Sequence, residues 1–177
     1  GNAFTGAVTL SNSGSNDVSI DNGIALALAA SSVGRNLTVT ETGSGGAITQ
    51  TGALTVPTTS NFTAGSNAIT LTQNNALTGA VSLSNSSTNN VSLTNTLATV
   101  LGASTIGQNL TITSSSGAIS QTGALTVGGT SSFTAGANAI TLTQSNAFTG
   151  AVSLSNSGAN NVALTNGSAL VIGTSSV

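Results

Sequence analysis

Short runs in which apolar residues alternate with Thr or Ser recur along the whole chain. Examples are Val8-Thr9-Leu10, Ile69-Thr70-Leu71-Thr72 and Val81-Ser82-Leu83. An alternation with a period of two places one side of a strand in a core and the other in water, so we expect Val81 to face inward and Ser82 outward. The β-branched residues in these runs favour strands further. Because no segment carries a helical stripe with capping residues at both ends, the pattern predicts an all-β chain.

The strand-like runs return about every 7 to 11 residues, which leaves no room for helical crossovers. Small turn formers such as Ser11–Gly14 and Gly43–Gly46 separate them. Two architectures fit this spacing: an antiparallel sandwich, or a β-solenoid whose strands stack in parallel from coil to coil. The turns do not follow the hairpin pattern of Asn-Gly pairs in two-residue loops, which favours the solenoid. Pro57 directly follows a run, and its missing N–H predicts a corner.

The sequence repeats itself at long range. NAFTGAVTLSNSGSNDVSI at Asn2–Ile20 returns as NALTGAVSLSNSSTNNVSL at Asn75–Leu93 and as NAFTGAVSLSNSGANNVAL at Asn146–Leu164. GAITQTGALTV at Gly46–Val56 returns as GAISQTGALTV at Gly117–Val127. The steps between copies are 73 and 71 residues, which gives repeats over residues 2–74, 75–145 and an incomplete 146–177. Repeats that bury no core alone must stack, so we expect one continuous β-solenoid segment over residues 1–177.

A coil of roughly 17–20 residues predicts about four coils in each repeat and nine or ten in the chain. We expect equivalent positions of the copies to stack in register, around a core of Val, Leu, Ile and Ala. Phe62 and Phe133 are equivalent, as are Phe4 and Phe148, with Leu77 between them. We interpret these aromatic residues as core filling, not as platforms for a ligand. The third copy stops at Val177, equivalent to Val33, so we expect a piece of a longer array.

Charge is almost absent: 2% of the residues are charged, against roughly 25% in an ordinary globular chain. Nucleic-acid affinity depends largely on Lys and Arg, and Arg35 is the only base, so we expect no nucleic-acid partner. No run approaches the roughly 18 apolar residues that span a bilayer, so we expect no membrane insertion. Cysteine is absent, which excludes disulfides and thiolate metal sites.

The sequence contains no catalytic constellation. Without His or Cys, neither Ser-His nor Cys-His nucleophilic systems are available. Asp17 and Asp21 suggest the carboxylate pair of a polysaccharide-active β-helix, and Glu41 is the third acid, at the turn that varies in length. Their counterparts, like that of Arg35, are uncharged: Asn90, Thr94 and Ser114 for the acids and Gln108 for the base. We therefore interpret the charges as drift on a solvated face, and predict no catalytic residue, cofactor or metal site and no enzymatic activity.

Pairs of the form Thr-x-Thr recur along the chain, and they suggest an alternative function. They lie at Thr38–Thr40, Thr70–Thr72, Thr111–Thr113 and Thr141–Thr143. A flat ladder of such pairs orders water, which would make this an ice- or solute-binding solenoid. The competing interpretation is that they are outward-facing strand residues that tolerate water. Ser or Asn replaces the Thr in several runs, which favours the second interpretation.

The combination of GAITQTGALTV, AGSNAITLTQ and NAFTGAVSLSNSG resembles the repeat regions of filamentous-haemagglutinin-like bacterial surface adhesins. The resemblance covers the whole chain and implies a right-handed parallel β-helix that forms a stalk or an extracellular filament. It also implies an exported protein, extracellular or on the bacterial cell surface. The matching region is scaffold, so no functional residue is carried over and no receptor is named. A solenoid has open strand edges at both ends, and a net charge near zero gives little repulsion between such ends. We therefore expect end-to-end self-association or continuation into a longer chain.

Overall fold

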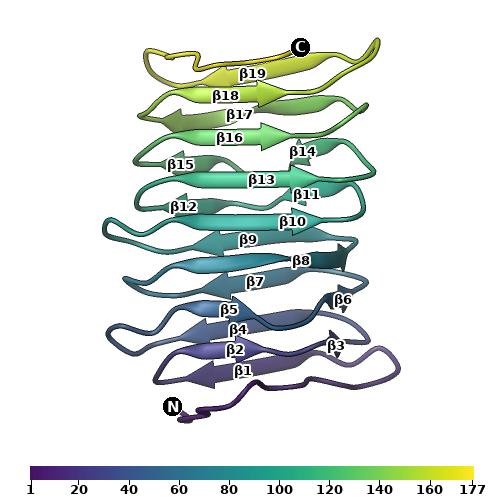
Figure 1. The fold of residues 1–177 in the computed structure, drawn as a ribbon, viewed down its shortest axis with the longest axis vertical. Coiled ribbons are helices and arrows are strands. Elements are labelled where there is room, and N and C mark those ends of the chain that lie inside the picture. The colour runs from purple at the N-terminus through teal and green to yellow at the C-terminus, as the bar shows by residue number, and fades with distance from the viewer.

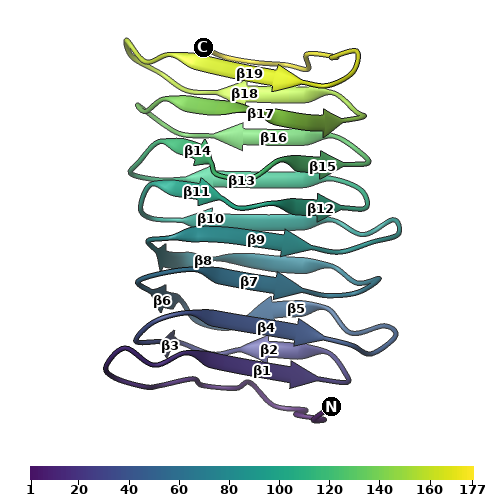
Figure 2. The same cartoon turned by 180° about the vertical axis from the view of Figure 1, so that it is seen from behind.

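The chain winds into a right-handed parallel β-helix with two opposing flat faces. The structure, a computed structural model, describes all residues from Gly1 to Val177. In Figure 1 the strands of the near face run from left to right, and those of the far face run back behind them while the chain climbs. Figure 2 shows the same winding from behind. Every strand pairing is parallel, so the solenoid is confirmed and the antiparallel sandwich was the wrong alternative. The structure has no helix, and hence none that could cross a membrane.

The two faces are the ten-stranded sheet, called face A, and the nine-stranded sheet, called face B. Face A contains β1 (Val18–Asn22), β4 (Leu37–Glu41), β7 (Ser60–Thr63), β9 (Ala80–Ser84), β11 (Thr99–Leu101), β12 (Ser104–Ile106), β14 (Ile119–Gln121), β15 (Leu125–Val127), β17 (Ile140–Phe148) and β19 (Val162–Asn166). Face B contains β2 (Leu26–Leu28), β3 (Ser31–Ser32), β5 (Ile48–Gln50), β6 (Leu54–Val56), β8 (Ile69–Leu77), β10 (Val91–Asn95), β13 (Leu110–Ser114), β16 (Ser131–Thr134) and β18 (Val152–Ser155).

Each coil is longer than the sequence-based estimate. Each turn of the solenoid takes about 21 residues, so the expected coil of 17–20 residues was too short and the expected nine or ten coils were too many. The register shows the step directly, because Ser60 of β7 pairs with Val81 of β9. A coil must cross both faces and turn two corners. A half-coil therefore holds one longer strand, such as β10, or two short ones, such as β11 and β12.

The repeat contains three and a half coils, and this half-integer value places successive copies on opposite faces. β1 lies on face A, whereas its counterpart β10, which begins 73 residues later, lies on face B. β10 in turn corresponds to β19, which is again on face A. The expectation that equivalent positions stack on one another is therefore wrong. A column of the core is instead built from residues that are not equivalent in the repeat. On face A, for example, Val39, Phe62 and Leu83 stack on three successive coils.

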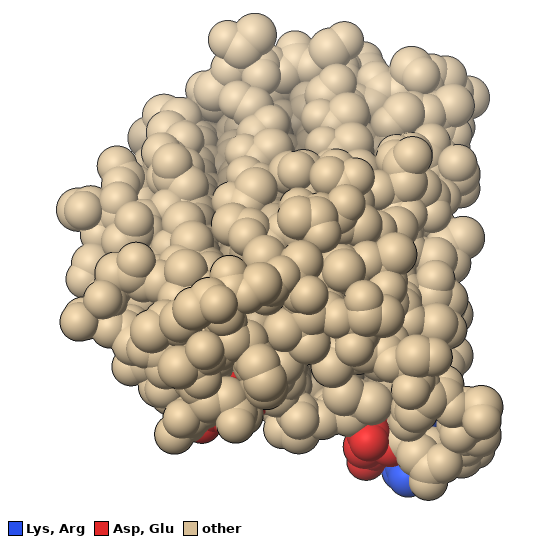
Figure 3. All heavy atoms as spheres, turned by 60° about the horizontal axis from the view of Figure 1, so that its bottom comes forward, with Lys and Arg blue, Asp and Glu red and all other residues tan.

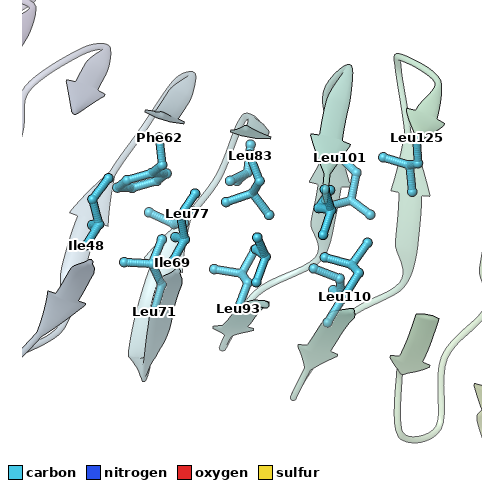
Figure 4. Close-up of a cluster of buried hydrophobic side chains, with 14 of the residues drawn as sticks. Ile48, Phe62, Ile69, Leu71, Leu77, Leu83, Leu93, Leu101, Leu110 and Leu125 are labelled. Atoms are coloured by element: carbon cyan, nitrogen blue, oxygen red, sulfur yellow. The ribbon is translucent and has the colours of Figure 1, made fainter. Parts of the chain in front are cut away.

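The core lies between the two faces. In Figure 4 the labelled side chains of both rows of strands, such as Phe62 and Leu83 from one and Ile69 and Leu93 from the other, point toward each other. Val81 is fully buried and Ser82 faces outward, as the alternation predicts. The core cluster holds 32 buried apolar residues in one continuous column. Burying this much apolar surface is the main driving force that keeps the coils stacked.

The aromatic residues are mostly core residues, as expected. Phe62, Phe133 and Phe148 are buried, and the rings of Phe133 and Phe148 meet edge to face with centroids 6.0 Å apart. Phe4 differs, because it lies in the first coil and is 43% exposed. Pro57 directly follows β6 at an exposed bend, which confirms its predicted place at a corner.

One corner is strained in only one of the three copies. Gly14 and Gly158 adopt positive φ values of 72° and 74°, and their counterpart Ser87 has a φ of 62°. A side chain in this left-handed region costs roughly 1–2 kcal/mol, while a glycine loses more backbone entropy on folding.

We therefore expect Ser87→Gly to stabilise the protein by about 0.5–1 kcal/mol, measured as a higher urea midpoint. The control is Thr88→Gly at the next residue, where φ is not positive and no gain is expected. An equal gain in both variants would show that the effect does not come from the backbone conformation of Ser87.

Candidate functional site

All four charged side chains lie in the first coils, between residues 17 and 41. In Figure 3 the charged atoms gather at the lower, N-terminal end of the molecule. Arg35 Nε lies 3.5 Å from Asp17 Oδ1, and both side chains are about half exposed, at 54% and 55%. An exposed pair of this kind contributes little to stability, about 0–1 kcal/mol. Asp21 is also exposed and accepts a hydrogen bond of 3.3 Å from the Thr42 hydroxyl.

Glu41 differs from the sequence-based expectation, which placed it on a solvated face. Its side chain is only 1% exposed. Oε1 accepts a hydrogen bond of 2.6 Å from the Gly43 N–H, and Oε2 accepts one of 2.7 Å from Asn67 Nδ2. The physical reason is that Glu41 occupies the last inward position of β4, directly above Asn22, where its carboxylate accepts the N–H of Gly43 in the following loop and the side-chain amide of Asn67. The residue is a structural part of that corner.

The structure brings no set of reactive groups together. No three residues among His, Cys, Asp and Glu lie close enough to hold a metal ion. The single groove, of about 320 Å³, is lined by small or apolar side chains without charge, among them Thr9, Leu10, Ala30 and Thr55. Three buried hydroxyls have no hydrogen-bond partner, those of Ser60, Thr99 and Ser131. Ser60 and Ser131 share their strands with the bulky Phe62 and Phe133 and lie in apolar columns, so they are small core residues.

The Thr-x-Thr pairs do not form one ladder, because they are divided between the two faces. Thr38–Thr40 and Thr141–Thr143 lie on face A, whereas Thr70–Thr72 and Thr111–Thr113 lie on face B. Around Thr111 and Thr113, the outward positions of four successive strands all carry hydroxyls: Ser92, Thr94, Thr111, Thr113, Ser132, Thr134, Ser153 and Ser155. The corresponding surface on face A is interrupted by Asp21 and Asn61.

The most specific polar contacts of the molecule lie inside the coils, at the bends between β5 and β6 and between β14 and β15. At each bend a Gln and an Asn form a paired amide. Gln50 Nε2 donates to Asn75 Oδ1 at 2.7 Å, and Asn75 Nδ2 donates to Gln50 Oε1 at 3.1 Å. Asn75 Oδ1 also accepts the Leu54 N–H at 2.8 Å, and Nδ2 also donates to the Leu71 and Thr94 carbonyls. Asn75 is fully buried. One side chain thus connects three successive coils.

The next repeat reproduces this arrangement on the opposite face. Gln121 Nε2 donates to Asn146 Oδ1 at 2.8 Å, and Asn146 Nδ2 donates to Gln121 Oε1 at 3.0 Å. Asn146 also accepts the Leu125 N–H at 2.9 Å and donates to the Leu142 and Thr165 carbonyls. Because every polar atom of these buried amides is paired, the burial of the amides is compensated.

A second group of inward asparagines occupies one position in all three copies: Asn22, Asn95 and Asn166. Asn95 Oδ1 accepts the Leu77 N–H at 2.9 Å, and Nδ2 donates to the Leu77 carbonyl at 3.0 Å. Asn22 makes the same two bonds to Phe4, and Asn166 makes them to Phe148. Each of these residues therefore fixes the coil 18 residues earlier in the chain.

Sequence reasoning missed these amides because it assigned polar residues to the outward side or to turns. Comparison of the three copies does contain a signal that these asparagines are buried. Asn stays at the positions of Asn22 and Asn75 in all three copies, while Asp21 becomes Thr94 and then Thr165. A polar residue that does not drift between copies is typical of a buried and fully bonded group.

Comparison with known proteins gives one family. The profile described as "Repeats of unknown function (DUF5649)" matches residues 15–84 and again residues 88–155. No curated protein and no solved structure matches the chain. The two matched segments begin 73 residues apart, which is the repeat step of the sequence, and together they cover more than half of the chain. The chain therefore belongs to this family of repeats of unknown function.

Proposed function

We propose that this chain is a structural segment in the stalk or extracellular filament of an exported bacterial surface adhesin. The protein is a repeat β-solenoid with a structural role. The resemblance of GAITQTGALTV and NAFTGAVSLSNSG to adhesin repeats supports the finer proposal. In this proposal the segment has no enzymatic activity and no cofactor, and it carries a binding region away from the surface to which it is anchored.

The observation that carries the proposal is that the two complete repeats make the same buried amide contacts. The Gln50–Asn75 and Gln121–Asn146 pairs share their partners atom for atom, and each fixes three coils. A catalytic site would require a set of side chains that differs from this repeated background. Repetition of the same buried contacts is instead what a rod of constant stiffness requires, since each repeat contacts only its neighbours.

We expect antibodies raised against Gly1–Val177 to label intact cells of the source bacterium. The expected result is equal labelling before and after the cells are permeabilised, because an exported stalk is reachable from outside. An antibody against a cytoplasmic protein serves as the control, and it must label only permeabilised cells. Labelling by the solenoid antibody only after permeabilisation would overturn the proposed location.

A further inference from the structure

The outer side of face B carries two straight rows of hydroxyl groups. The strands β8, β10, β13, β16 and β18 pair side by side, and in Figure 1 the last four lie one above another on the near face. Their register aligns the outward residues of successive coils. One row contains Thr70, Ser92, Thr111, Ser132 and Ser153, and the other contains Thr94, Thr113, Thr134 and Ser155. We call these two rows the hydroxyl surface.

The protein itself does not use the hydroxyls of this surface. The hydroxyls that make hydrogen bonds within the protein lie at bends and loops, as those of Ser104 and Thr130 do, and none belongs to the two rows. No charged residue lies on these five strands. Since a hydroxyl donates one hydrogen bond and accepts up to two, every group of this neutral surface is available in both senses.

The two rows also have a fixed spacing in both directions. Neighbouring strands lie about 4.8 Å apart, and alternate residues of one strand lie about 6.6 Å apart. The inward residues between the rows, such as Leu93, Ile112 and Phe133, are buried in the core, which holds the strands in place. These spacings are close to the two perpendicular repeats of the oxygen atoms on a prism face of ice. Water molecules bound to such rows can therefore continue into an ice lattice.

The shape of the hydroxyl surface differs from that of a site for a dissolved small molecule. Such sites are concave and lined largely by apolar and aromatic side chains. The single groove of the molecule lies at Thr9 and Ala30, away from these five strands. No aromatic residue faces outward on them, since Phe133 is buried. A flat crystalline surface is the partner that fits this face.

We propose that the hydroxyl surface binds growing ice through water molecules held in its two rows. Ser replaces Thr at several positions, but Ser retains the hydroxyl at each of them, so neither row is broken. The corresponding surface on face A lacks this continuity, because Asp21 and Asn61 interrupt it. This activity is additional to the proposed filament role and does not depend on the proposed location.

The test measures how strongly the protein is enriched in ice grown slowly from dilute solution, and by how much it lowers the freezing point below the melting point. We expect both effects for the original chain. Thr111→Tyr, at the centre of the surface, is expected to reduce them about tenfold or more, because its ring displaces the bound water. Thr113→Tyr is a second variant of the same kind. The control Thr126→Tyr places the same side chain on the exposed side of β15, on face A, and we expect no loss.

Circular dichroism establishes that each compared variant is folded. Losses in Thr111→Tyr and Thr113→Tyr but not in Thr126→Tyr support the proposal. Exclusion of the original chain from ice as complete as that of serum albumin would overturn it, as would equal activity in all three folded variants. Retention on insoluble cellulose without enrichment in ice would also overturn it, because the surface would then bind a carbohydrate. Cell-surface labelling enters none of these outcomes, so ice binding and the proposed location fail separately.

Discussion

Replacing Asn75 by alanine is expected to destabilise the protein by about 3–6 kcal/mol, because several buried groups lose their partners at once. The Leu54 N–H, the Leu71 and Thr94 carbonyls and the Gln50 amide all bond to this side chain. Each buried group left unpaired costs about 1–3 kcal/mol. The loss is a large part of the roughly 5–15 kcal/mol that keeps a domain folded. The measurement is urea unfolding followed by circular dichroism.

The preceding residue provides the control. Asn74 is the same residue type on the same strand, but its side chain is exposed and makes no hydrogen bond within the protein. We expect Asn74→Ala to change the stability by no more than about 0.5 kcal/mol. If both variants unfold at the same urea concentration, the paired amides do not hold the coils together as argued here.

A charge at an inward position is expected to have an effect of similar size. Val127 of β15 is fully buried, and we expect Val127→Lys to cost at least about 3–5 kcal/mol because no partner is available for the ammonium group. Thr126, its neighbour and near isostere, is exposed on the outer side of the same strand. We expect Thr126→Lys to be nearly neutral. Thermal unfolding of both variants measures the difference, and equal losses would contradict the assignment of inward and outward sides.

The strands and their parallel stacking could be predicted from the sequence because both depend on local patterns. Alternation in Ile69–Thr72 and Val81–Leu83 sets which side chains face the core, and tandem copies imply stacking. The coil length could not be predicted in the same way. The two faces have the same alternation, so a half-coil on face A and one on face B look alike in the sequence.

The buried polar groups inside the coils could not be predicted, for a different reason. Whether Asn75 or Glu41 is buried depends on partners about 20 residues away, on the coils above and below. Pattern alone assigns such residues to the solvent side, since a polar group is buried only when it is fully hydrogen-bonded. The coil length must therefore be known before these partners can be identified.

Because each repeat ends with a half-coil, the number of repeats sets the orientation of the later part of the rod about its long axis as well as the length of the rod. One inserted repeat lengthens the rod by about 17 Å, at about 4.8 Å for each coil, and also turns everything beyond it by half a revolution about the long axis. Two inserted repeats add about 34 Å and restore the original heading. Gain or loss of a single copy by recombination would therefore reverse the direction in which later surfaces point, whereas changes in pairs would alter only the reach.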